Sequence, residues 1–192
     1  MANKNEFQPD RQKLGILDRL YLTRQQRKIV LKWALYALTL LILSLLQDVV
    51  LCRFKLLGAT TDLLPFAVIL ICLLEGVDGG SVFALCASCF YLFSGTAPGV
   101  YAMVILTVLC VFSTLFRQAF LQKGFLAAMV CAIPTMFIYE LLIYLFGLFL
   151  DLAHPARIIG FLITAGLTCA TALILYPLFL RIASIGGEPW TE

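Results

Sequence analysis

The charged residue placed most deeply in an apolar stretch is Glu140, which is followed by Leu141-Leu142-Ile143-Tyr144. A charge near the middle of a bilayer costs roughly 3 kcal/mol on insertion scales, so this carboxyl should face protein or be protonated. Tyr144 lies four residues on, on the same face of a helix, and is a candidate contact. We therefore expect a buried protein contact at Glu140. The alternative is a position near the membrane interface, where water meets the carboxylate.

Other residue types that could do chemistry have structural explanations. Asp62 begins an apolar stretch, so we expect its side chain to cap a helix rather than bind a ligand. Cys86 and Cys89 have CxxC spacing but lie within an apolar stretch, where thiolates are disfavoured, and are expected to pack. A single histidine, His154, makes no metal site. The sequence therefore predicts no enzyme, no catalytic residue, no cofactor and no metal site. No basic stripe with interleaved aromatic residues points to nucleic acid.

These residues belong to a chain whose composition is too apolar for a water-soluble domain. Hydrophobic residues make up 62% of the 192 residues, whereas soluble domains are about half apolar. Only seven of the 25 charged residues fall between Leu63 and Leu180. Water cannot solvate so much apolar side chain, so we expect lipid to surround most of the protein.

Six apolar stretches, separated by short polar segments, predict an all-α integral membrane protein with a six-helix transmembrane bundle. The stretches are 33–51, 63–77, 81–93, 100–116, 124–150 and 158–180. Only the last two comfortably exceed the roughly 20 residues that cross a bilayer. The short second and third stretches are expected to be two spanning helices joined by the glycine turn at 76–80; the alternative is a re-entrant pair.

The distribution of lysine and arginine predicts the orientation. With six crossings, eleven of these residues fall on the side of the N-terminus, eight of them before residue 33, and three on the other side. Because positive charge is retained in the cytoplasm, both termini should be cytoplasmic. We divide the chain into a basic cytoplasmic leader (1–28), a six-helix membrane domain (29–183) and a cytoplasmic tail (184–192). The leader is either a surface helix on anionic lipid or a solvated tail.

The order of several short motifs resembles the rod shape-determining membrane protein family MreD over about residues 33–183. The motifs are Leu46-Gln47-Asp48, Thr61-Asp62-Leu63-Leu64, the glycines Gly76, Gly79 and Gly80, Leu92-Phe93-Ser94-Gly95 with Pro98-Gly99, Tyr139-Glu140-Leu141-Leu142, and Leu175-Tyr176-Pro177-Leu178-Phe179.

The resemblance implies a non-enzymatic scaffold of the bacterial cell-elongation machinery in the inner membrane, which supports rod shape and lateral peptidoglycan synthesis. Its implied partners are an MreC-like bitopic protein, other elongation-machinery membrane proteins and membrane lipid. The implied fold is similar to the substrate-binding components of vitamin transporters, so the alternative function is a substrate-capture subunit of a vitamin or metal importer. The residues expected to make partner or structural contacts are Gln47, Asp48, Asp62, Tyr139, Glu140 and Tyr144.

Overall fold

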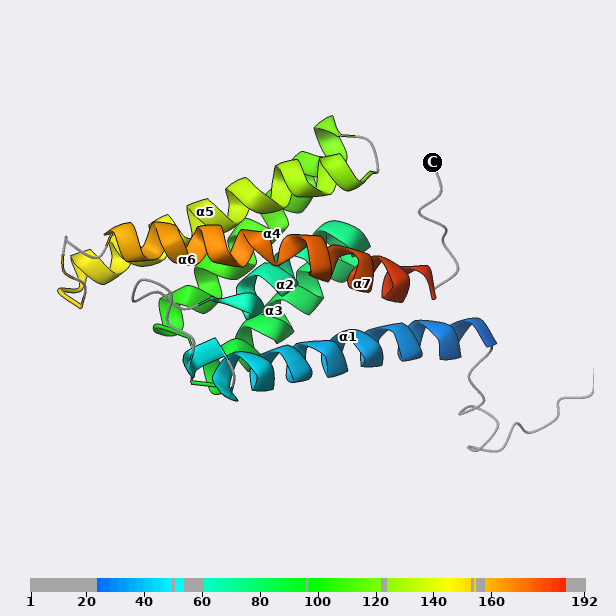
Figure 1. The fold of residues 1–192 in the computed structure, drawn as a ribbon. Helices are drawn as coiled ribbons and strands as arrows, with labels where there is room; N and C mark the ends of the chain where they lie inside the picture. The colour runs from blue at the N-terminus through cyan, green and yellow to red at the C-terminus, as the bar shows by residue number, and fades with distance from the viewer. Residues whose placement is uncertain are drawn as a thin grey trace, which may run out of the picture.

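The computed structural model describes residues 24–49, 51–53, 61–95, 97–121, 124–152, 154 and 158–185, and within these every regular element is a helix. The elements are α1 (Arg24–Val49), a short 3-10 helix η2 (Leu51–Arg53), α2 (Leu63–Glu75), α3 (Val77–Phe93), α4 (Val100–Phe120), α5 (Phe125–Phe149), α6 (Ile158–Ala170) and α7 (Ala172–Ser184) (Figure 1). Most of the expected leader and nearly all of the expected tail lie outside the described residues.

Several helices have the length and apolar character that a membrane crossing requires. Among the described residues, α1, α4 and α5 contain 26, 21 and 25 residues and are long and apolar enough to cross a bilayer. Helices α6 and α7 meet the same condition as a pair that is bent by 47°. Helices α2 and α3 are apolar but shorter, with 13 and 17 residues. The prediction of an all-α protein with multiple apolar spans is therefore confirmed for this part of the chain.

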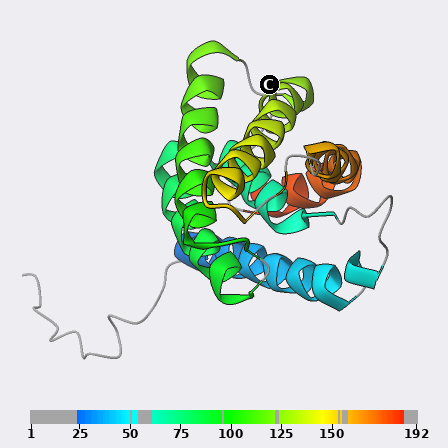
Figure 2. The ribbon, with the colours of Figure 1, turned by 90° about the vertical axis from the view of Figure 1, so that its left-hand side faces the viewer.

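Helix α2 forms the centre of the bundle. Every residue from Leu63 to Leu74 is buried, and α2 contacts α1, α3, α4, α5, α6 and α7 (Figures 1 and 2). A helix that is apolar on all sides is expected at such a position, because it has no face that must meet water. Carboxylates mark its two ends: Asp62 precedes the first residue, and Glu75 is the last. We call these the Asp62 end and the Glu75 end of α2.

A tight glycine turn joins α2 to α3. Gly76 has a φ of +87°, a backbone conformation that favours glycine. One turn into α3, a Cβ on Gly80 would lie 3.0 Å from both the Cα and the carbonyl oxygen of Cys72. The Cys72 thiol donates a hydrogen bond to the Gly80 carbonyl at 3.1 Å. The two helices therefore pack backbone against backbone near the Glu75 end, as small residues allow within membranes.

The ends of two helices differ from those expected from the apolar stretches. Helix α1 begins at Arg24 rather than at the start of the apolar stretch, because long unbranched residues such as Lys28 and Lys32 continue a helix readily. The last stretch is not one helix, since it divides at Thr171 into α6 and α7. The Thr171 hydroxyl donates to the Thr168 carbonyl at 2.6 Å, which offers the backbone a local alternative to the helical pattern.

Candidate functional site

The Asp62 end of α2 is held by a side chain from another helix. Gln47, near the end of α1, accepts hydrogen bonds through its Oε1 from the backbone N–H groups of Leu63 and Leu64, at 2.9 and 3.2 Å. Its Nε2 donates to Oδ1 of Asp62 at 2.9 Å. The expectation that the Asp62 side chain caps α2 is therefore wrong. Asp62 occupies the capping position without a side-chain capping bond, and Gln47 satisfies the free N–H groups instead.

Asp62 itself is fixed by α1, α3 and α6. The Tyr91 hydroxyl on α3 donates to Oδ2 of Asp62 at 2.6 Å, and the Asp62 backbone N–H donates to the Thr168 hydroxyl on α6 at 3.0 Å. Asp62 precedes the first residue of α2, and burial raises the pKa of its carboxyl to about 6, against the lowering effect of the hydrogen bonds from Tyr91 and Gln47. At neutral pH this residue is mainly a carboxylate with two neutral donors.

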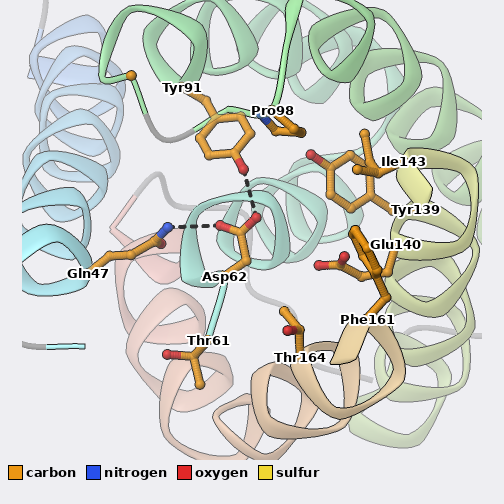
Figure 3. A pocket seen from close by; sticks show the side chains of 11 residues that line it. Gln47, Thr61, Asp62, Tyr91, Pro98, Tyr139, Glu140, Ile143, Phe161 and Thr164 are labelled. Atoms are coloured by element: carbon orange, nitrogen blue, oxygen red, sulfur yellow. Dashed lines mark hydrogen bonds between the residues drawn. The ribbon is translucent and has the colours of Figure 1, made fainter. Parts of the chain in front are cut away.

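A cavity of about 410 Å³ lies against this end of α2 (Figure 3). Its lining comes from α1, the two residues that precede α2, α3, the α3–α4 connection, α5 and α6. The lining residues are Gln47, Thr61, Asp62, Tyr91, Gly95, Pro98, Tyr139, Glu140, Ile143, Phe161 and Thr164. Residues more than 100 positions apart in sequence therefore meet at one hollow.

Glu140 brings a second carboxylate to the cavity. Its side chain extends from α5 toward Asp62 (Figure 3), whose charge is near enough to act on it. The residue is only 5% exposed. Among the described residues, no hydrogen bond or ion pair to the Glu140 carboxylate is found. Two acidic residues thus line one cavity, without a lysine or arginine from the described residues beside them.

Two hydroxyl groups beside the cavity lack hydrogen-bond partners. The Tyr139 hydroxyl belongs to a residue that is 1% exposed and makes no hydrogen bond to the described residues. The Thr61 hydroxyl is also buried and unpaired within the same part of the chain. Because buried polar atoms are nearly always hydrogen-bonded, unpaired groups on a cavity wall indicate a site for water or a bound molecule.

The structure gathers four of the six predicted site residues at this cavity: Gln47, Asp62, Tyr139 and Glu140. Asp48 is exposed and does not line it. Tyr144 lines a much smaller hollow with Glu140 on the side of α6, and no hydrogen bond between Tyr144 and Glu140 is among the described contacts.

Tyr91, Thr164 and Thr168 were not predicted as site residues. The signal for them was weak: each is a polar side chain within an otherwise apolar stretch, a pattern that also fits ordinary helix packing.

The Glu75 end of α2 has a different arrangement. Lys32 on α1 donates to Oε2 of Glu75 at 2.6 Å, and the Tyr36 hydroxyl donates to Oε1 at 2.7 Å. The side chains of Lys32 and Glu75 are 15% and 8% exposed. The Lys32 ammonium also lies 5.7 Å from the centre of the Trp33 ring, within reach of a cation–π interaction. Each oxygen of this carboxylate has a donor, and one donor is a cation.

The described residues offer little for other kinds of chemistry. No group of three or more His, Cys, Asp or Glu side chains among them could hold a metal ion. Cys86 is exposed on α3, and Cys89 is partly buried with its sulfur 3.8 Å from that of Met103. The predicted packing role therefore fits Cys89 better than Cys86.

Comparisons of the sequence and the structure with protein-family models, with curated proteins and with solved structures find no match.

Proposed function

We propose that this chain is a multi-pass inner-membrane scaffold of the MreD type, a non-enzymatic component of the bacterial cell-elongation machinery. In this proposal six segments cross the membrane: α1 to α5 each cross once, and α6 with α7 forms one bent crossing. Both termini then face the cytoplasm, so the Asp62 end of α2 lies on the outer side. An MreC-like bitopic protein and other elongation-machinery membrane proteins are the proposed partners, together with membrane lipid.

One observation carries the proposal: residues from separate motifs of the MreD resemblance lie at one place. Gln47, Asp62, Glu140, Gly95 and Pro98 all line the cavity, although they come from four different motifs along the chain. Motifs that matched by accident in unrelated apolar stretches would have no reason to converge. Their meeting supports the view that the resemblance reflects one structural unit.

A scaffold must offer surfaces to partners, and this bundle has long exposed apolar faces. Helix α1 exposes Leu38 and Leu45, and α5 exposes Leu141 and Leu145. Lipid is the default neighbour of such faces within a membrane. Bitopic partners would pack against part of the same surface through a single apolar helix.

Site-specific crosslinking in whole cells tests the scaffold role. A photo-reactive residue would replace Leu45 on α1 or Leu145 on α5, with Phe112 on α4 as the matched exposed control from a third helix. If a single-pass protein docks on one helix face, the position on that face should give one discrete crosslinked product, and the positions on the other helices should give none. The proposal also predicts loss of rod shape on depletion, so normal cell width and normal wall synthesis in a depleted strain would overturn it.

A substrate-capture subunit of a vitamin or metal importer is the second candidate, and the cavity is the observation that favours it. Its volume of about 410 Å³ falls within the range of about 300–1,000 Å³ typical of ligand sites. A thermal-shift screen with vitamins separates the two roles, because a ligand that binds only the folded state stabilises it. Strong stabilisation by one vitamin would favour capture.

A further inference from the structure

We infer that the cavity at the Asp62 end of α2 binds an organic cation, with an ammonium or guanidinium group held between the carboxylates of Asp62 and Glu140. The inference does not depend on the scaffold proposal, because it concerns binding by the isolated chain.

First, the cavity is lined by two acidic side chains. Glu140 extends toward Asp62, whose carboxylate is turned to Gln47 and Tyr91 (Figure 3), and no lysine or arginine lines the cavity among the described residues. Tyr91 and Gln47 donate to Asp62 but add no positive charge. A second buried acidic group beside Asp62 is costly in its charged form, so it either holds a proton or is accompanied by a cation. A bound cation would allow both groups to be carboxylates and would give each an attractive contact.

The second argument is the set of polar atoms without partners. Tyr139 is almost fully buried on the cavity wall, yet its hydroxyl has no hydrogen-bond partner among the described residues. The Thr61 hydroxyl on the opposite side shares this condition. The two hydroxyl oxygens are closed to solvent, so a small rotation of the side chain would bring either of them to a bound molecule, where a hydroxyl can accept from an N–H group or donate to an oxygen. A bound organic molecule would therefore satisfy atoms that the protein leaves open.

The third argument distinguishes an organic cation from a bare metal ion. The cavity is far larger than an ion, and it offers two carboxylates rather than the several oxygen ligands that Mg²⁺ or Ca²⁺ requires. The rings of Tyr91, Tyr139 and Phe161 are part of the lining. Aromatic rings attract organic cations and supply apolar surface for the rest of the molecule. The site thus combines a charged centre with apolar walls, as sites for small molecules usually do.

Helix α6 supplies Phe161 and Thr164 to the cavity and Thr168 to the backbone of Asp62. It ends at the bend of α6 and α7. Interrupted helices border the binding sites of many membrane transporters, where the free ends of the half-helices point at the ligand. Here the break at Thr171 lies outside the cavity lining, and α6 contributes through its side chains.

Binding can be measured on the purified full-length chain in nanodiscs with two matched probes, phenethylammonium and its uncharged analogue 2-phenylethanol. We expect saturable binding of phenethylammonium with a rise in the unfolding temperature, and no such effect of 2-phenylethanol. Glu140→Gln should weaken phenethylammonium binding by about tenfold or more, because one of two charged contacts is lost. Glu140→Asp, which keeps the charge, should retain more of the affinity than Glu140→Gln.

Two further probes distinguish whether the cation is a side chain of a partner protein or a free amine. They are lysine and arginine with both backbone ends blocked as amides, so that only the side chain is charged. Tighter binding of a capped amide than of phenethylammonium would assign the site to a side chain of a partner protein. The reverse order would assign it to a free amine. Asp48→Asn is the matched control, since Asp48 is an exposed carboxylate that does not line the cavity, and this variant should bind phenethylammonium like the natural chain.

Three results would overturn the inference. Equal effects of phenethylammonium and 2-phenylethanol would show that the positive charge plays no part. Stabilisation by Mg²⁺ or Ca²⁺ alone, without an effect of any ammonium probe, would show a metal site instead. Lys55 and Arg157 lie outside the described residues. If phenethylammonium failed to bind the natural chain and bound only after both were replaced by glutamine, a cation of the chain itself would be the occupant.

Discussion

The two ends of α2 place carboxylates in one apolar bundle under opposite conditions. At the Glu75 end, Lys32 and Tyr36 each donate to one oxygen of the carboxylate. At the Asp62 end, the carboxylates of Asp62 and Glu140 border an open cavity and have no cation among the described residues. Removing the cation from a buried ion pair leaves an uncompensated charge and is strongly destabilising, whereas an acidic group beside a cavity without a cation remains available to a ligand. The comparison separates a structural group from a binding group of the same chemical type.

The largest effect is expected from breaking the pair at the Glu75 end. Lys32→Met keeps the length of the side chain but leaves Glu75 nearly buried without its cation, and should lower the free energy of unfolding by about 3 kcal/mol. Denaturant titration in mixed micelles measures the change. Lys28→Met is the control, because Lys28 is exposed on the same helix. If both variants lowered the free energy of unfolding equally, the ion pair of Lys32 with Glu75 would make no specific contribution to stability.

Removal of the cap at the Asp62 end should have the next largest effect. Gln47→Leu keeps the size of the side chain but removes its bonds to Asp62 and to the N–H groups of Leu63 and Leu64. We expect the free energy of unfolding to fall by about 2 kcal/mol, because the Asp62 carboxylate loses a donor and the two backbone N–H groups lose their acceptor. The same titration tests it. A stability equal to that of the natural chain would show that water replaces Gln47 and that this end is more open than described.

A smaller loss should follow from filling the close contact of α2 with α3. Gly80→Ala places a Cβ 3.0 Å from the backbone of Cys72, so the helices must move apart, at a cost of about 1.5 kcal/mol. The matched variant is Gly166→Ala on α6, where a Cβ meets no atom within 4 Å. It should leave stability unchanged or raise it slightly. The opposite order of the two variants would contradict the close packing near the Glu75 end.

The smallest effect on stability is expected at Glu140. Glu140→Gln replaces a buried acidic group that has no hydrogen bond among the described residues, so stability should stay within about 1 kcal/mol of the natural value or rise. Glu75→Gln provides the direct contrast, because it weakens the bond to Lys32 and should be clearly destabilising. If both variants lost the same stability, Glu140 would have a stabilising partner within the chain. The proposed difference between the two ends would then disappear.

Long apolar stretches were sufficient to predict the helices, because bilayer thickness and backbone hydrogen bonding leave few other structures for such segments. The break at Thr171 was not predicted, since the residues on both sides are equally apolar and the break depends on local hydrogen bonds of Thr168 and Thr171.

Four of the eleven residues that line the cavity, Gln47, Asp62, Tyr139 and Glu140, were predicted as site residues, but the cavity itself was not predicted. The contributions of Tyr91 and Thr164 depend on which faces α3 and α6 turn toward α2. Helix packing decides this orientation, and the sequence of one helix alone does not contain it. The ion pair of Lys32 with Glu75 was missed for the same reason, because its partners are 43 residues apart.

The central position of α2 also has a consequence for biosynthesis. The helices that cover it include α4, α5 and α7, which are synthesised later. If α2 crosses the membrane as proposed, a nascent chain that has just inserted it would expose it to lipid on the sides that these helices will occupy. An uncharged apolar surface from Leu63 to Leu74 suits both environments in turn. Under that proposal the same residues would serve first as a membrane-insertion signal and afterwards as the interior of the finished protein.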